Sequence, residues 1–446
     1  MSYDIKFNAY HQYIPVKNAL INRIPAHWSA TRLKFLLETP LQYGANESAE
    51  STEPNQPRYI RITDIDSTGN LRSNTFRSLP ESVAEPYILK SGDMLFARSG
   101  ATVGKTFLYK ESWGRACYAG YLIRASVDQT KLIPQFLKYF SLSDAYLGWA
   151  SSVEIQATIQ NISAEKYANL TIPLPDLSEQ HAIANFLDRE TATTDTLIAK
   201  KRELIERLQE KRTALISHAV TKGLDSTVPM RDSGVEWMGE IPAHWEIKRI
   251  KHLSFLGNGS TPFRQNETYW KNGTIPWLTS TVVNDMIVQP ATQFVTETAL
   301  AECHLPVVEP NSVLVAITGQ GKTRGKAALL QYQATINQHM VYIKPKSYQL
   351  NSEFLQFYLS SMYQILRFIS EGTGSTKGAL TVEQISEFPV ALPPLDEQEL
   401  IVLNLQSNTK QLDKLKIAIN KMIEKLQEYR IALISAAVTG KIDVRG

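Results

Sequence analysis

The sequence lacks most of the features that mark secreted or membrane-bound proteins. It has only two cysteines, Cys117 and Cys303, in unrelated contexts, so neither a disulfide framework nor a thiolate metal site is expected. No stretch approaches the ~18 uninterrupted apolar residues of a membrane span, and the N-terminal residues contain no apolar signal segment. We therefore expect a soluble, cytoplasmic protein that does not bind a membrane.

An excess of charge of one sign is also missing. The chain has 47 Lys and Arg residues against 44 Asp and Glu, which gives a formal net charge of +3. This balance excludes a polycation. Any nucleic-acid-binding face would have to concentrate its positive charge locally.

Motifs of catalytic and cofactor sites are absent as well. The segment Ser99–Thr106 reads SGATVGKT, but only three residues separate Gly100 from Gly104, where a Walker A loop needs four. The eight histidines include no pair spaced i,i+4, which makes a zinc site improbable. We find no nucleophile or acid/base pair, and we expect neither an enzyme nor a bound cofactor or metal.

What the sequence does contain is an internal duplication across its 446 residues. IPAHW occurs at Ile24–Trp28 and again at Ile241–Trp245, 217 positions later. Ile205–Thr221 (IERLQEKRTALISHAVT) matches Ile423–Thr439 (IEKLQEYRIALISAAVT), 218 positions later. Between these anchors, LPDLSEQ ending at Gln180 corresponds to LPPLDEQ ending at Gln398. The two halves must share one fold.

The halves diverge between the anchors: Gly44–Ser82 and Gly257–Thr298 share little beyond apolar spacing. A shared frame with different inserts is typical of two binding modules for different ligands, although neutral drift in surface loops gives the same pattern. The repeated Trp28 and Trp245 fit packing where domain and helix join. Gln180 and Gln398 fit either a structural turn or a surface shared by docked partners.

Two stretches, from about 178 to 220 and from about 396 to 438, have heptad spacing and predict helices extending roughly 60 Å. Ser178 and Asp396 are candidate N-caps, and Gly223 and Gly440 candidate ends. The predicted seams are Thr194, Leu197, Lys201, Leu204, Leu208, Lys211 and Leu215, and Leu412, Leu415, Ile419, Met422, Leu426, Tyr429 and Leu433.

The predicted fold class is α+β. Strand-like runs such as Asp93–Arg98 and Ser312–Thr318 each lead into a Gly-rich basic loop, and they predict a mixed, largely antiparallel sheet with short helices. Two such tandem domains would be separated by the two long helices, paired as an antiparallel coiled coil. The expected boundaries are 1–175 and 241–393 for the domains, 176–222 and 394–446 for the helices with the C-terminal tail, and 223–240 for a linker.

The order of these motifs resembles the specificity subunit of a type I restriction–modification system. The resemblance rests on IPAHW, ARSGATVGKT, LPDLSEQ and LPPLDEQ, and the paired ALIS-x-AVT endings, and it covers nearly the full chain. It implies two target-recognition domains, each reading one half of a bipartite double-stranded DNA sequence. It also implies helices that dock two modification (methyltransferase) subunits, restriction (motor–nuclease) subunits that join them, and a chain that is itself non-catalytic.

Polar and basic loop residues are the candidate DNA contacts, since bases are read by donors and acceptors and phosphates by cations. They are Arg61, Thr63, Arg98, Ser99, Thr102 and Lys105 in the first domain, and Thr279, Ser280, Thr281, Lys322, Arg324 and Lys326 in the second. Lys105 and Lys326 occupy equivalent positions and suit phosphate, whereas Arg61 aligns with Leu278 and suits base reading. The alternative is a coiled-coil scaffold with two protein-binding modules and no role at nucleic acid.

Overall fold

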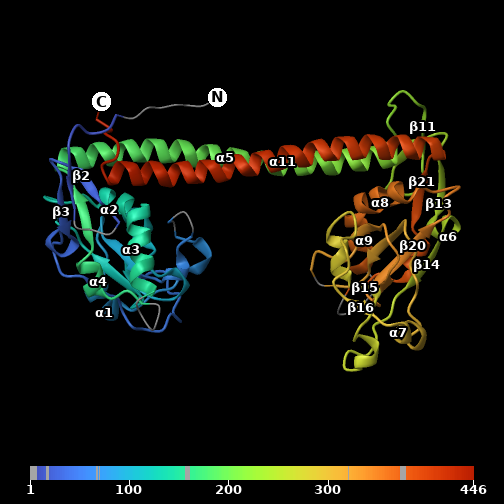
Figure 1. Cartoon of the computed structure of the whole chain (residues 1–446), viewed down its shortest axis with the longest axis horizontal. Coiled ribbons are helices and arrows are strands. Elements are labelled where there is room, and N and C mark those ends of the chain that lie inside the picture. Colours follow the sequence, from blue (N-terminus) through green and yellow to red (C-terminus); the bar gives the residue numbers. More distant parts are fainter. Residues whose placement is uncertain are drawn as a thin grey trace. The chain divides into compact units, whose positions relative to one another are not determined.

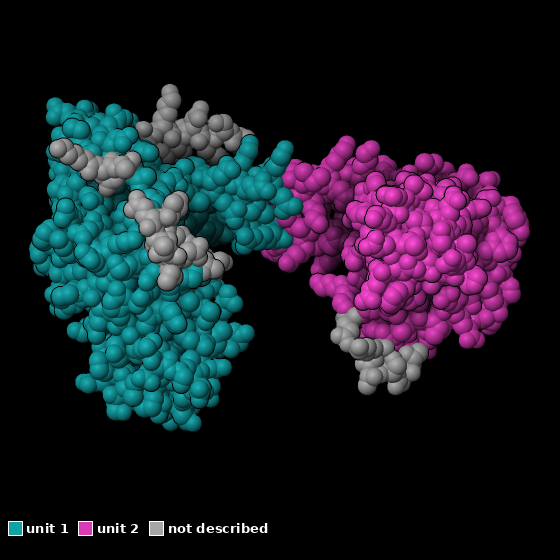
Figure 2. All heavy atoms as spheres, turned by 60° about the horizontal axis from the view of Figure 1, so that its bottom comes forward, with its two compact units in different colours: residues 1–202, 420–446 teal, residues 203–419 magenta. Residues whose placement is uncertain are grey.

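The computed structural model describes residues 8–16, 20–66, 69, 71–155, 161–319, 321–371 and 378–445. The chain forms two compact units (Figures 1 and 2). Unit 1 consists of Met1–Arg202 and Asn420–Gly446, and unit 2 consists of Glu203–Ile419. No helix among the described residues is both long enough and apolar enough to cross a membrane.

The described residues of unit 1 form ten short strands and a few short helices. Its strands are β1 (Tyr13–Pro15), β2 (Arg23–Pro25), β3 (Ser29–Arg32), β4 (Gln42–Tyr43), β5 (Arg58–Ile60), β6 (Met94–Ala97), β7 (Thr106–Leu108), β8 (Ala116–Tyr118), β9 (Leu122–Ala125) and β10 (Thr171–Leu174). Its short helices are α1 (Glu81–Ala84), α2 (Pro134–Phe140), α3 (Asp144–Ile155) and α4 (Ala164–Ala168).

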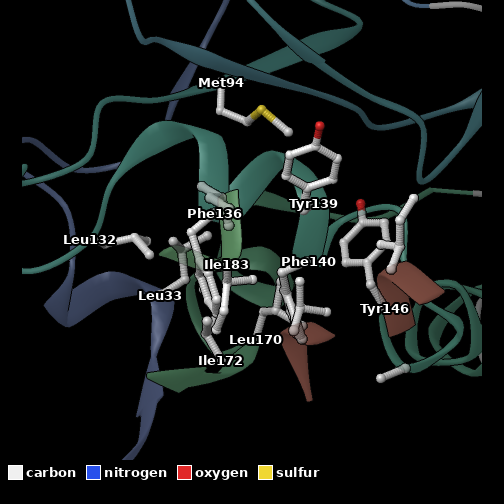
Figure 3. Close-up of a cluster of buried hydrophobic side chains, with 14 of the residues drawn as sticks. Leu33, Met94, Leu132, Phe136, Tyr139, Phe140, Tyr146, Leu170, Ile172 and Ile183 are labelled. Carbon is white, nitrogen blue, oxygen red and sulfur yellow. The ribbon is translucent and has the colours of Figure 1, made fainter. Parts of the chain in front are cut away.

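The central sheet of unit 1 is antiparallel, with the order β4-β9-β6-β7, and β5 pairs with β8 in parallel. β3 and β10 pair over four residues, so the inserted module begins and ends at one place. One face of the sheet packs on α2, α3 and the start of the first long helix. Figure 3 shows part of this core, with Phe136 beside Ile172 and Ile183, and with Phe140 between them and Tyr146.

Unit 2 repeats this plan with other side chains. Its strands are β11 (Met230–Asp232), β12 (Glu240–Pro242), β13 (Glu246–Arg249), β14 (Ser254–Asn258), β15 (Ile275–Leu278), β16 (Phe294–Val295), β17 (Ser312–Ala316), β18 (Ala327–Leu330), β19 (Thr335–Ile336), β20 (Met340–Pro345) and β21 (Pro389–Leu392). Its short helices are α6 (Ile250–Leu253), α7 (Glu297–Glu302), α8 (Ser352–Ser361), α9 (Tyr363–Glu371) and α10 (Val382–Ser386).

The sheet order β14-β20-β17-β18 in unit 2 corresponds strand by strand to the central sheet of unit 1. β15 pairs with β19 in parallel, as β5 does with β8, and β13 pairs with β21 as β3 does with β10. The predicted α+β class, with two tandem domains of largely antiparallel sheet, is therefore confirmed.

The two long helices are α5 (Leu177–Lys222) and α11 (Leu395–Val438), which run side by side in opposite directions (Figure 1). Both predicted ends are confirmed: Gly223 and Gly440 follow the helices with φ of 80° and 70°, values that glycine adopts without strain. The predicted N-caps are wrong by two residues. Asp176 caps α5 by accepting a hydrogen bond from the amide of Glu179, and Asp396 lies inside α11.

Within each unit, part of α5 pairs with part of α11. Asp195 and Arg430 form an ion pair of 3.0 Å in unit 1, and Arg212 and Asp413 approach to 3.9 Å in unit 2. Asp195 and Asp413 lie 218 positions apart, as do Arg212 and Arg430, so the duplication places the same ion pair in both halves. The predicted antiparallel pairing is confirmed.

The predicted seam is right at every second position; the others are one residue off, except in α11, where Leu415 and Lys416 are both exposed. In α5 the buried or half-buried positions are Thr194, Ile198, Lys201, Ile205, Leu208, Arg212 and Leu215. The predicted seam residues Leu197, Leu204, Leu415, Met422 and Tyr429 are instead 42–49% exposed. The error arises because pairs such as Leu197–Ile198 offer two adjacent apolar residues, and both choices alternate steps of three and four.

The repeated tryptophans and glutamines anchor the modules to the long helices. The indoles of Trp28 and Trp245 are buried and donate to the carboxylates of Glu179 (3.0 Å) and Glu397 (3.1 Å). Gln180 is fully buried, accepts from the amide of Ile133 and donates to two backbone carbonyls. Gln398 repeats all three bonds in unit 2. The glutamines are therefore structural and present no docking surface.

In unit 1 the two ends of the chain meet where unit 2 has a continuous connection. Asn8 pairs with Asp443, and the hydroxyl of Tyr10 donates to Glu179 at 2.7 Å. Burial, followed by this bond to a carboxylate, raises the pKa of Tyr10 far above its ordinary value. The tyrosine therefore stays a neutral donor and helps satisfy a carboxylate that is only 1% exposed.

Candidate nucleic-acid interface

The candidate residues of unit 1 lie on two loops of the module. Arg61 and Thr63 follow β5, at the short 3-10 helix Ile62–Asp64. Arg98, Ser99, Thr102 and Lys105 lie between β6 and β7. The two loops are adjacent at their bases, because the turn after β8 donates to Ile60 and accepts from Arg98. The structure thus brings these residues to one edge of the module.

Arg61 is held by its own loop. Its Nε and Nη2 donate to the two carboxylate oxygens of Asp64 at 3.1 and 2.7 Å, and Nη2 also donates to the carbonyl oxygen of Thr75. The hydrogen bond to Asp64 raises the pKa of Arg61 above its ordinary value. Asp64 is fully buried, so removing Arg61 would leave a buried carboxylate without its cation. The side chain therefore orders the loop in addition to any contact with DNA.

Arg98 is half-buried and is oriented by two neighbours. Its guanidinium carbon lies 4.6 Å from the ring centroid of Tyr43, and its Nε donates to Asn161 at 3.3 Å. Ser99 forms a backbone bridge with Asn161, which ties the end of the module to the same loop. A guanidinium that stacks on a tyrosine keeps its outer donors available and pre-oriented, which suits contact with a base edge or a phosphate.

Lys105 differs from the arginines because its side chain is exposed. Its backbone carbonyl accepts from Ala97 at 2.8 Å, so the residue has a fixed position at the start of β7. Thr102 lies in the short 3-10 helix just before it. An exposed ammonium on a fixed backbone suits a phosphate better than a base edge, because it carries charge without a directional fork.

The candidate residues of unit 2 occupy the corresponding loops. Thr279, Ser280 and Thr281 follow β15, and the hydroxyls of Thr279 and Thr281 lie 2.9 Å apart. Lys322 and Lys326 lie between β17 and β18. Lys322 is exposed, and the Nζ of Lys326 donates to Asn284 at 3.0 Å.

Arg324 is placed differently from the other candidates. It is buried, donates to the carbonyl oxygen of Gly378 and pairs with Glu371 at 3.3 Å. Arg367, on the same helix as Glu371, donates to the carbonyl oxygen of Gly321 at 2.7 Å. In this structure Arg324 therefore joins the Gly-rich loop to α9 and exposes little surface to a ligand.

The loops of the two units share one backbone frame. Three amide-to-carbonyl hydrogen bonds in unit 1 have counterparts in unit 2. Ala119 to Ile60 corresponds to Asn337 to Leu278, and Arg98 to Tyr121 corresponds to Ile317 to His339. Ala97 to Lys105 corresponds to Ala316 to Lys326. Their lengths in the two units differ by no more than a few tenths of an ångström. The predicted equivalence of Lys105 and Lys326 is confirmed.

The frame corrects one alignment made from the sequence. Because Ile60 and Leu278 accept the equivalent bonds, the counterpart of Arg61 is Thr279 and not Leu278. The insertions between the anchors change the offset, and apolar spacing alone does not resolve a shift of one residue. Arg61 and Thr279 both cap a 3-10 helix in extended conformation, so the same position carries a cation in one unit and a hydroxyl in the other.

Sequence reasoning missed one element of this edge, the turn between β8 and β9 and its counterpart between β19 and β20. Tyr121 and His339 lie at the equivalent place in these turns. In the sequence, a glycine directly after the first strand of each central sheet, Gly44 after β4 and Gly259 after β14, could have indicated a close backbone approach. A Cβ on Gly44 would collide with the carbonyl oxygen of Tyr118, and one on Gly259 with that of Ile336. Both glycines allow the first strand to pack closely against the turn.

The described residues contain no cluster of three or more histidine, cysteine or acidic side chains able to hold a metal. What the edge presents is a row of hydroxyl, amide, basic and aromatic side chains on a fixed backbone. Such groups bind and discriminate between ligands by hydrogen bonding and charge, and the arrangement suits recognition of a polyanion.

Comparison with known proteins identifies relatives along nearly the whole chain. The family model described as type I restriction modification DNA specificity domain matches residues 45–207 and 242–426, more than half of the chain. A Methanocaldococcus jannaschii protein with the provisional name type I restriction enzyme MjaX specificity subunit is 24% identical over 443 residues, covering 96% of this chain and 97% of the relative. The type I restriction enzyme MjaVIII specificity subunit of the same organism is 22% identical over 433 residues, 95% of each chain.

Solved structures have the same fold. A chain from a study of complex assembly and conformational transition of the type I R-M system superposes with a TM-score of 0.70 at 19% identity, covering 94% of this chain and 99% of its own. The HsdS subunit from Thermoanaerobacter tengcongensis gives a TM-score of 0.56 at 19% identity, with 94% and 98% covered. At this identity the likeness concerns the fold alone.

Proposed function

Because the chain belongs to the family of type I restriction modification DNA specificity domains, we propose that it is the subunit that reads a bipartite double-stranded DNA target for a restriction–modification complex. Each target-recognition domain, 1–175 and 241–393, would read one half of the target. The chain itself would carry no catalytic step and no cofactor. It would act in the cytoplasm, where the DNA is.

The observation that carries this proposal is one backbone frame presenting two sets of side chains. Three pairs of loop hydrogen bonds recur in the two units, yet Arg98 is replaced by Ile317 and Arg61 by Thr279. A constant frame fixes where a side chain stands, and a changed side chain alters the donors and acceptors offered there. That is the requirement for reading two different base sequences with one fold.

The outer surfaces of the long helices support a role in assembly. Exposed apolar residues recur at heptad intervals, Leu197 and Leu204 on α5, and Leu415, Met422 and Tyr429 on α11. Under the offset of 218, Leu197 corresponds to Leu415 and Leu204 to Met422, whereas Tyr429 corresponds to Lys211. We propose that the two modification subunits dock on these repeated surfaces, since a duplicated surface offers the same contacts twice. Restriction subunits would join the complex so formed.

The proposal is tested by exchanging one module between relatives. β3 with β10, and β13 with β21, close the two modules, so residues 33–170 and 250–388 can be replaced without breaking those strand pairs. We expect replacement of 33–170 to change one half of the recognised sequence, and replacement of 250–388 to change only the other half. Mapping of methylated adenines made by the assembled complex measures both. A change in both halves from one exchange, or no sequence-specific DNA binding by the parent complex, would contradict the proposal.

Phosphate contacts make a separate prediction for the two equivalent lysines. Lys105→Ala and Lys326→Ala should each weaken binding to all DNA sequences and reduce the slope of log affinity against log salt by about one. Titrations over a range of salt concentrations, on target and unrelated duplexes, measure the effect. Lys90→Ala is the matched control for Lys105: both lysines are exposed, but Lys90 precedes β6, at the other end of the strand. An equal loss in the control, or a loss confined to the target duplex, would remove these lysines from the phosphate contacts.

A further inference from the structure

Two turns at the candidate edge carry exposed ring side chains that neither the sequence motifs nor the family comparison assigns a role. Tyr121 follows β8 and is 65% exposed, and His339 follows β19 and is also exposed. The exposed Tyr121 ring presents both apolar area and a hydroxyl to solvent, where a ligand can reach them. The two turns form matching backbone hydrogen bonds, so Tyr121 and His339 occupy equivalent positions.

The backbone holds both rings at one place. The carbonyl oxygens of Tyr121 and His339 accept from Arg98 and Ile317, each at 3.0 Å, where the basic loop begins. Two residues earlier in each turn, an amide bonds the last residue of β5 or β15. Each turn is therefore fastened on both sides, to the two loops that carry the candidate DNA contacts. The backbone of Tyr121 and of His339 is therefore fixed next to both loops.

The surroundings of Tyr121 are cationic and aromatic. The bond from its carbonyl makes it a direct neighbour of Arg98, whose guanidinium is stacked on Tyr43. A phenol in this place offers a hydroxyl that donates or accepts and a ring face for a thymine methyl group or an exposed base. The adjacent guanidinium provides attraction for the phosphates on either side.

The surroundings of His339 are neutral and polar. Its Nδ1 lies 2.8 Å from the hydroxyl of Thr318, which orients the ring, and Nε2 forms no hydrogen bond with the described residues. The neighbouring Gln338 accepts a hydrogen bond from Thr261, so the turn is fixed on that side as well. An oriented imidazole offers one directional group to a base edge: a protonated Nε2 donates to N7 or O6 of a purine, and an unprotonated Nε2 accepts from a base amino group.

We propose that Tyr121 and His339 are corresponding base-contacting residues, each determining one base position in the half-site read by its own domain. This inference rests on the proposed DNA-reading function and adds to it the residues at which the two domains differ in what they read. Because Tyr121 and His339 occupy equivalent positions, each reaches the corresponding base step of its own half-site. Because their side chains differ, they accept different bases there.

The test is a reciprocal substitution in the complete chain, purified with its modification subunits. Tyr121→His and His339→Tyr are each incubated with duplexes randomised across both half-sites, and retained duplexes are sequenced. We expect Tyr121→His to change the base preference at one position of one half-site by about tenfold, leaving the other half-site unchanged. His339→Tyr should do the same at the corresponding position of the other half-site. Phe35→Ala and His252→Ala, exposed ring residues outside these turns, are the matched controls.

The outcomes separate this inference from the proposed function. If the parent complex selects a bipartite sequence and both substitutions leave every preference unchanged, Tyr121 and His339 are not base-contacting residues, while the DNA-reading function stands. If the parent complex selects no sequence, the proposed function itself fails. Thermal unfolding checks that each variant is folded. Tyr121→Ala and His339→Ala, which remove each ring, provide second variants, and an unchanged preference in both would overturn the inference equally.

Discussion

Gln180→Met is expected to lower the free energy of unfolding of unit 1 by about 3 kcal/mol. The side-chain amide of Gln180 is fully buried and satisfies the amide of Ile133 at 2.9 Å and the carbonyl oxygens of Lys131 and Pro175 at 2.8 and 3.0 Å. Methionine keeps nearly the same volume but removes all three bonds. The loss therefore reports on unsatisfied buried backbone groups and not on a cavity.

Gln398→Met is the internal replicate of this experiment. Its side chain makes the same three bonds, to Asn351, Gln349 and Pro393, so a similar loss is expected in unit 2. Gln209→Met, at an exposed position of α5, should change stability by no more than about 0.5 kcal/mol. Denaturant unfolding with hydrogen exchange resolved by segment assigns each loss to its unit. Equal stability of Gln180→Met and Gln209→Met would show that these bonds do not fasten the module to the helix.

The same glutamines show what the sequence could and could not predict. The duplication identified Gln180 and Gln398 as equivalent, because both end a repeated motif at the start of a helix. It could not decide between a structural turn and a shared docking surface, since both roles preserve one side chain at two sites. Burial decides, and burial depends on residues near 131 and 349 that the motif does not include.

The helices were predicted well and their contact faces less well. Heptad spacing and the terminal glycines placed α5 and α11 within two residues of their observed ends. The seam passes through Ile198 and Arg212 and leaves Leu197 exposed. The heptad pattern cannot choose between Leu197 and Ile198, which are both apolar, or between Lys211 and Arg212, which are both cationic. The structure accommodates Arg212 because Asp413 faces it from the other helix.

At the candidate interface, local motifs found the loops but not their alignment between the units. The Gly-rich basic loops identified Lys105 and Lys326 correctly as equivalents. Arg61 was matched to the wrong residue, and Tyr121 was not found at all. Both depend on pairing between strands far apart in the chain, β5 with β8 and β6 with β9, and such pairing leaves no local periodic signal.

Insertion of four residues into both long helices is expected to lengthen the unread spacer between the half-sites by one or two base pairs. The proposed positions are after Arg202 in α5 and after Ile419 in α11, where one unit gives way to the other in each helix. Four residues add about 6 Å of rise and turn the helix about 40° beyond a full turn. A base pair of B-DNA rises about 3.4 Å and turns about 35°. The added rise therefore corresponds to about two base pairs of spacer, and the added rotation to about one.

The placement in both helices follows from the packing. An insertion near Thr191, inside unit 1, would break contacts within that unit, such as the one between the hydroxyls of Thr191 and Tyr139, which lie 3.3 Å apart. An insertion in one helix alone would shift the contact face of that helix along the other helix. Methylation mapping with the assembled variant measures the spacer, and four residues added after Asp225, in the connection between α5 and β11, provide the control. Both half-sites should be unchanged in each case, because the recognition loops are untouched. If the doubly extended protein assembles and methylates with its original spacer, the paired helices do not set the distance between the two reading domains, and the modules must reach their half-sites through flexibility elsewhere.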